Sequence, residues 1–360
     1  MELTSEPKPS NTVTEFWKWF QENENHFREI YKDPTEGLSF IEDIMEQLKP
    51  VNPWLKAMAG QYGDDTFELV ITTDGDIAFF SKAYELINAA PPITGWVFNA
   101  LKPAMGFENI RINMYGREFS GNTVQFYPIL DEAHPDEVTI MLTHQDYNEE
   151  DDEQFQTGGM ILLENGLGEL ATATKIDGFE TGPVPQGGAG DLIPLTKLPD
   201  YLNWREKEFV EKYELQGGAL PEESFSYMEA KDTEGRPMMA VMNQAYVDWD
   251  FKPAYPWLVI VELTFQSANN GLPNEQQLQE IEQIEEELLK LLPEKRMIHL
   301  GHRIYDNTWR IFNYANDFMN VSRIILDYID KNTSPYTIVL DIEKDKYWQT
   351  IEQFFEEPQL

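Results

Sequence analysis

The sequence contains no cysteine among its 360 residues. Disulfide frameworks, thiol nucleophiles and thiolate metal sites are therefore excluded, and the composition agrees with a soluble cytoplasmic protein. No apolar run reaches the length of about 18 residues that a membrane-spanning helix needs. Residues 1–11 have neither a basic start nor an apolar core, so we expect neither a signal peptide nor a transmembrane helix.

Positive charge is also scarce, because 27 Lys and Arg stand against 64 Asp and Glu, a formal net charge of -37. Binding to a phosphate backbone requires clustered Lys and Arg, and the chain has no basic stripe. Nucleic acid and anionic membranes are therefore not expected as partners. The negative charge can maintain solubility, provide an acidic face for a basic partner, or reflect a salt-adapted host. The composition leaves these three explanations open.

Sequence motifs of common active sites are missing. There is no Gly-x-Ser-x-Gly elbow, no His-Glu-x-x-His pair and no Walker loop. The sequence therefore names no catalytic residue, and we expect no cofactor.

Large apolar side chains are plentiful, with 9 Trp, 16 Tyr and 21 Phe in a chain that is 41% hydrophobic. Such a composition can offset the entropy lost on folding, and the length suggests two domains. We predict a tail at residues 1–11, an N-terminal mixed αβ domain at 12–215 and a C-terminal domain at 219–360. The candidate linker is Gln216-Gly217-Gly218.

The C-terminal third has the clearest periodicity. Residues 257–265 alternate as a strand, and an apolar stripe follows at Leu278, Ile281, Ile284 and Leu288, which indicates a helix. A hairpin over 297–316, a helix over 320–331 and a strand over 336–342 complete a βαββαβ unit, preceded by its own hairpin from residue 225. This order predicts an α+β protein whose C-terminal domain is ferredoxin-like, with two helices on one face of a four-stranded antiparallel sheet.

In the N-terminal domain, strands and helices alternate. Residues 123–130 and 137–143 are predicted to pair as strands, after a turn-rich interval that follows residue 101. An acidic loop at 146–153 precedes a helix marked by Met160, Leu163, Leu167 and Leu170. A short strand is predicted near 172–176.

Several short segments resemble known bacterial families. Asp248-Trp249-Asp250, residues 255–259 and residues 270–273 look like the family catalogued as domain of unknown function 695. That family is similar to the superfamily of the ribonuclease E activity regulator B, whose fold is ferredoxin-like. Residues 16–20, 73–75 and 90–96 look like an uncharacterised N-terminal domain that accompanies it. The resemblance implies a regulatory binding role and carries over no catalytic residue.

One candidate metal site lies in the N-terminal domain. His144 and Asp146 end a predicted strand, and Glu149 follows within the acidic loop. Oxygen-rich loops can hold a hard cation and an imidazole can act as a base, so a metal-dependent hydrolase is the alternative function. The spacing does not match a calcium loop, and a hydrated acidic loop is the competing explanation.

The leading hypothesis is a non-enzymatic binding or regulatory protein that presents acidic surface to a basic protein. Its contact residues are predicted on the outer face of the helix after Asn274, at Glu275, Glu282, Glu285 and Glu286, and the acidic loop at 146–153 is a second predicted contact surface. An immunity protein that neutralises a basic toxin is a special case of this hypothesis.

A histidine pair lies in the predicted hairpin of the C-terminal domain. His299 and His302 are three positions apart in a strand, so they should point to opposite faces and cannot share an ion without a bulge. We expect both to be structural.

Overall fold

The computed structural model describes residues 11–30, 39–63, 65–185, 192–214, 219–292, 296–352 and 354–355. Two compact units are present: residues 1–129 with 138–202, and residues 130–137 with 203–360. The predicted linker at Gln216-Gly217-Gly218 lies outside the described residues, as do residues 1–10 of the predicted tail. Mixed helices and antiparallel strands confirm the α+β class.

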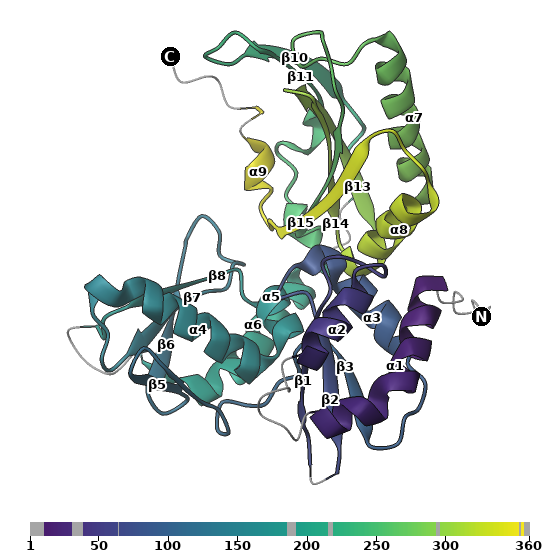
Figure 1. Cartoon of the computed structure of the whole chain (residues 1–360). Helices are drawn as coiled ribbons and strands as arrows, with labels where there is room; N and C mark the ends of the chain where they lie inside the picture. Colours follow the sequence, from purple (N-terminus) through teal and green to yellow (C-terminus); the bar gives the residue numbers. More distant parts are fainter. Residues whose placement is uncertain are drawn as a thin grey trace. The chain divides into compact units, whose positions relative to one another are not determined.

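The first unit begins with a three-stranded sheet in the order β1-β2-β3 (Figure 1). Its strands are β1 (Lys56–Gln61), β2 (Phe67–Thr72) and β3 (Trp96–Ala100), and its helices are α1 (Asn11–Ile30), α2 (Ser39–Leu48) and α3 (Phe80–Asn88), the last preceded by the 3-10 turn η1 (Ile77–Phe79). Trp17 is buried, packs edge-on against Phe98 and donates from Nε1 to the carbonyl of Leu86 at 2.7 Å. Trp19, two positions on, is half-buried, so this aromatic pair belongs to the core and its edge.

A second sheet of the first unit has four strands in the order β8-β7-β6-β9. The strands are β6 (Val124–Ile129), β7 (Thr139–His144), β8 (Gly178–Gly182) and β9 (Ile193–Pro194), beside a separate hairpin of β4 (Arg111–Met114) and β5 (Arg117–Ser120). The helical segments are η2 (Glu149–Asp151), α4 (Asp152–Leu167), α5 (Glu169–Lys175), η3 (Leu195–Lys197) and the start of α6 (Leu198–Glu214), which belongs to the second unit from residue 203 onward. The predicted pairing of 123–130 with 137–143 is present as β6 and β7.

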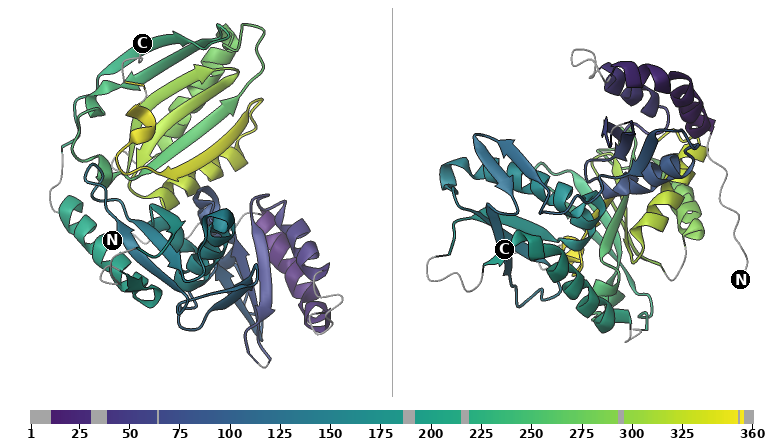
Figure 2. Two further views of the ribbon diagram at one scale, coloured as in Figure 1. Left: turned by 90° about the vertical axis from the view of Figure 1, so that its left-hand side faces the viewer. Right: turned by 90° about the horizontal axis from the view of Figure 1, so that it is seen from below.

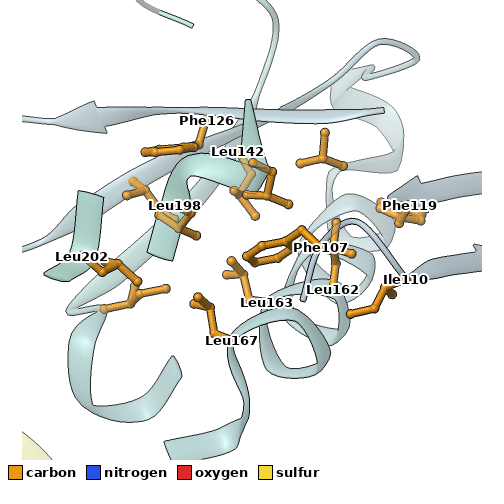
Figure 3. Packing of buried hydrophobic residues seen from close by; sticks show 14 of the residues in the cluster. Phe107, Ile110, Phe119, Phe126, Leu142, Leu162, Leu163, Leu167, Leu198 and Leu202 are labelled. Atoms are coloured by element: carbon orange, nitrogen blue, oxygen red, sulfur yellow. The ribbon is translucent and has the colours of Figure 1, made fainter. Parts of the chain in front are cut away.

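Leucine and phenylalanine side chains from α4, the second sheet and the start of α6 form the core of this region (Figure 3). Gly166 lies where α4 passes Phe107. A Cβ on Gly166 would meet the Phe107 ring at 2.1 Å, so only glycine permits this approach.

Two sequence-based expectations for the first unit were wrong. The segment predicted as a strand near 172–176 belongs to the helix α5. The Thr172 hydroxyl donates to the Gly168 carbonyl at 2.9 Å, so its hydrogen bond is made within the helix. The turn-rich interval after residue 101 contains the hairpin β4–β5, whose short strands carry little periodicity.

The second unit contains one antiparallel sheet of six strands in the order β10-β11-β13-β14-β12-β15. The strands are β10 (Phe225–Lys231), β11 (Pro237–Asn243), β12 (Trp257–Thr264), β13 (Met297–Tyr305), β14 (Thr308–Ala315) and β15 (Thr337–Lys344). The helices are α7 (Glu275–Leu291), α8 (Phe318–Lys331) and α9 (Gln349–Glu352), with 3-10 turns η4 (Gln244–Tyr246) and η5 (Lys252–Ala254). The sheet is wider than the expected four strands because β11 pairs with β13 and adds the preceding hairpin.

The two faces of this sheet are covered differently. The helices α7 and α8 lie on one face, and the short α9 lies on the other (Figure 1). Under α9, Trp348 is fully buried and stacks on Tyr314 at 4.1 Å between ring centroids. We call the α7 and α8 side the helix face and the α9 side the open face.

Candidate functional site

The first predicted site centres on His144 at the end of β7. Its imidazole is buried against Phe119 and Phe155. Nε2 lies 2.9 Å from the Glu118 carbonyl, and Nδ1 lies 3.0 Å from the Asp146 backbone N–H. A carbonyl only accepts and an N–H only donates, so Nε2 carries the proton and Nδ1 is the acceptor. Neither nitrogen is left over for a metal ion.

The carboxylates predicted to join His144 point elsewhere. Asp146 and Glu149 are exposed, and the nearest Asp146 oxygen is 4.0 Å from Nδ1 of His144. Within the ranges that the structure describes, no three His, Asp or Glu side chains are placed to hold a metal ion. The structure therefore gives the metal-dependent hydrolase hypothesis no geometric support.

The acidic segment after Asp146 is partly helical rather than a loop, because η2 and α4 begin within it. The Arg117 guanidinium pairs with Asp151, and Asp152 accepts from the Tyr147 hydroxyl at 3.0 Å. Hydrogen bonds from Asn148 and Arg117 hold the pKa of Asp151 below its usual value. These contacts occupy only part of the segment and leave Glu149 and its neighbour Glu150 exposed.

The second predicted site is the outer face of α7. Asn274 begins the helix with a capping box, in which its side chain accepts from the Gln277 N–H at 2.9 Å and the Gln277 side chain accepts in return. Glu275, Glu282 and Glu286 are exposed as predicted. Glu286 pairs with Lys290 at 3.1 Å, whereas Glu275 and Glu282 make no ion pair within the described residues.

Glu285 does not belong to this outer face, contrary to the sequence-based assignment. It is only 5% exposed and lies on the same side of α7 as the buried Ile281 and Leu288. Positions 281, 285 and 288 are spaced by four and three residues, which places them on one helix face. The sequence could have indicated this burial, because position 285 lies four residues after Ile281 and three before Leu288, within the apolar stripe.

The buried carboxylate of Glu285 receives donors from the sheet beneath it. Trp309 Nε1 donates to it at 2.9 Å, and His302 Nδ1 lies 3.1 Å from its Oε2. His299 Nε2 lies 3.5 Å from Oε1, while its Nδ1 lies 3.1 Å from Asn313 Oδ1. We call Glu285, His299, His302, Trp309 and Asn313 the buried polar cluster. Sequence reasoning did not foresee it.

His299 and His302 share a face because the strand is irregular. A register shift between His299 and Gly301 forms a bulge. In a regular strand, residues three apart point to opposite faces, but the bulge turns both histidines to the same face. Gly301 has φ of 133°, and a Cβ there would lie 1.8 Å from the Val241 carbonyl oxygen. Burial lowers the pKa of His299, and the nearby Glu285 offsets part of that effect. Both histidines are packed and partnered, as a structural role requires.

None of the helices in the described ranges is both long and apolar enough to cross a membrane. Searches of curated proteins and of solved structures found no match to this chain. A scan against protein-family models found a match that covers residues 227–355, from within β10 to the residues just after α9. The resemblance noted in the sequence is thereby confirmed for the C-terminal part: residues 227–355 match the family of unknown function DUF695.

Proposed function

We propose that this protein is a cytoplasmic binding or regulatory protein that uses acidic surface to bind a basic protein. The observation that carries the proposal is the outer face of α7, where Glu275 and Glu282 are exposed without a basic partner in the described part of the chain. They are seven residues apart, which is about two helical turns, so both carboxylates lie on one side of the helix.

The opposite side of α7 from these carboxylates is packed against the sheet. The buried polar cluster and the buried Ile281 and Leu288 hold the opposite side of α7 against the sheet. A partner therefore meets carboxylates whose backbone is already fixed, and less entropy is lost on association. The chain's net charge of -37 would add long-range attraction for a cationic protein and raise the association rate.

Exposed acids of the first unit offer a second acidic surface. Asp146, Glu149 and Glu150 are solvent-exposed at the start of the segment that leads into α4. Because these side chains are exposed, they can add long-range electrostatic attraction for a basic partner without making specific contacts.

We also propose that β12, α7, β13, β14, α8 and β15 form a ferredoxin-like arrangement. Its support is the order β13-β14-β12-β15 with antiparallel pairing throughout, in which β14 is inserted between the two strands that α7 connects. Folds of this kind host many unrelated functions, so the functional argument depends on the α7 surface.

The test is affinity capture from the lysate of the host at low and at physiological salt, followed by mass spectrometry. The wild type is compared with Glu275→Lys/Glu282→Lys. The control Glu132→Lys/Glu180→Lys makes the same change in charge at two exposed acids that do not belong to α7. We expect a basic protein that is retained by the wild type and the control, released by added salt and lost from the α7 variant. Equal retention by both double variants would show that α7 is not the contact surface.

A further inference from the structure

Arg303 occupies an unusual position on the open face of the six-stranded sheet. Its register partners are Ala240 on β11 and Arg310 on β14, and Arg310 is in turn opposite Glu262 on β12. Cross-strand partners share a face, so two guanidinium groups and one carboxylate lie side by side in this row. Figure 2 shows this face in its left panel, where the short α9 lies over only part of the strands.

Among the described residues, no carboxylate lies within ion-pair distance of Arg303. The Nε of Arg310 pairs with Glu262. The Nε of Arg303 is enclosed and has no acceptor, and the half-buried side chain makes no ion pair in the described structure. This is unexpected in a chain with 64 acidic and only 27 basic residues. Buried polar atoms without a partner are rare and usually indicate a missing interaction.

The surroundings make an added anion favourable. Burial lowers the pKa of Arg303 and the neighbouring Arg310 lowers it further, while the attraction of Glu262 and Tyr305 offsets only part of this effect. An anion placed between the two guanidinium groups would balance two positive charges with two negative ones. The interaction would be strengthened because the site is partly removed from water.

An aromatic ring borders the same position. The guanidinium carbon of Arg303 lies 6.0 Å from the centroid of the Phe354 ring, and Phe354 packs edge-on against Phe312 at 5.5 Å. A ligand that reaches Arg303 therefore also meets apolar surface. An organic acid with an apolar body fits this combination better than an inorganic anion does.

We propose that Arg303 and Arg310 form the anchor of a binding site for a small organic carboxylate on the open face of the second unit. The planar carboxylate would accept hydrogen bonds from guanidinium N–H groups, a pairing that both shapes favour. The apolar part of the acid would lie against Phe354. This site is separate from the acidic surface of α7, which is on the helix face.

The test uses benzoate as the probe, the neutral benzamide as its isosteric control, and inorganic phosphate as a second anion. Binding is followed by NMR titration of the full chain at constant ionic strength. We expect saturable binding of benzoate, weakened at least tenfold by Arg303→Met, and none of benzamide. Arg111→Gln removes one exposed arginine of the first unit, and we expect it to leave binding unchanged.

Three outcomes would overturn the proposal. They are no saturable benzoate binding by the wild type, equal benzoate affinity in Arg303→Met, and saturable binding of phosphate in preference to benzoate. Folding of Arg303→Met is checked by its thermal midpoint, which we expect not to fall because the substitution removes an enclosed Nε without a partner. Arg303→Lys, which keeps the charge but loses the planar fork, is the second variant and should bind benzoate with intermediate affinity.

Discussion

Two glutamates of α7 differ in role, because Glu285 is buried against the sheet and Glu282 lies on the exposed, proposed binding side. Glu285→Ala should lower the free energy of unfolding by about 3 kcal/mol, because it leaves the buried Trp309 Nε1 and the half-buried His302 without their acceptor. The matched control Glu282→Ala removes an exposed carboxylate from the same helix and should change stability by less than about 0.5 kcal/mol. Urea unfolding measures both. Similar losses in the two variants would contradict the assigned burial of Glu285.

The titration of His299 is a second test at the residue scale. Its pKa in the folded protein should lie below the ordinary value of about 6.5, because burial disfavours the imidazolium. Since the unfolded state then binds the proton more readily, this contribution to stability is complete above about pH 6.5 and is lost as the pH falls below it.

NMR titration of the His299 ring measures that pKa directly. In Glu285→Gln the pKa should fall further, because the attraction of the neighbouring carboxylate is removed while the shape is kept. A rise in that variant would show that Glu285 does not act on His299 electrostatically.

At the scale of elements, the bulge in β13 brings both His299 and His302 to the helix face of the sheet. Gly301→Ala should cost about 3 kcal/mol or more, because the new Cβ would overlap the Val241 carbonyl at a φ of 133°. Gly235→Ala also changes a glycine with positive φ, but no atom lies within 4 Å of its added Cβ, and it should cost about 1 kcal/mol. Thermal melting compares the two. Equal midpoints would show that the strand relaxes without loss.

The connection between β6 and β7 is another element that side chains hold in place. Asp136 accepts from Lys212 at 2.8 Å, from Tyr213 at 2.6 Å and from Tyr347 at 2.8 Å. Burial alone would raise the pKa of Asp136, but these hydrogen bonds outweigh it and lower the pKa. The carboxylate therefore stabilises the fold fully above its unfolded pKa of about 3.9, and the effect is lost as the pH falls below that value.

Asp136→Asn should accordingly cost about 2 kcal/mol at pH 7, with a difference from the wild type that shrinks below about pH 4. Glu132→Gln changes an exposed acid of the same connection and serves as the control. Urea unfolding across this pH range gives both curves. A difference that is independent of pH would mean that the charge of Asp136 is not what stabilises the connection.

The elements also differ in how well the sequence predicted them. The strands and helices from residue 257 onward were predicted because β12 alternates with a period of two and α7 carries a clear apolar stripe. The helix α5 was missed because Thr172 and Thr174 resemble strand residues, although their hydroxyls bond to the carbonyls of Gly168 and Leu170 within the helix. The strand propensity of these threonines was outweighed by side-chain hydrogen bonds to backbone carbonyls that form only in the helix.

For the whole molecule, the net charge of -37 implies self-repulsion in the compact state. The thermal midpoint should therefore rise by several degrees between about 10 mM and 150 mM NaCl, as the Debye length falls from about 30 Å to about 8 Å. A continued rise in molar salt would favour a salt-adapted host, and a plateau near physiological salt would favour a surface that serves solubility or binding. Scanning calorimetry provides the measurement. A midpoint that falls with added salt would contradict net repulsion.

The sequence alone determined the properties that depend on residue type and order. The lack of cysteine, the excess of acids, the order of elements in the C-terminal unit and the DUF695 resemblance all follow from the chain as written. The tertiary structure decided which charges are exposed and which are enclosed. Glu282 and Glu285 are alike in sequence, yet one faces solvent and the other accepts from Trp309. Arg303 likewise lacks an ion-pair partner within the described residues only because strand register places it opposite another arginine. Burial and pairing depend on neighbours distant in the sequence, so composition and periodicity could not reveal them.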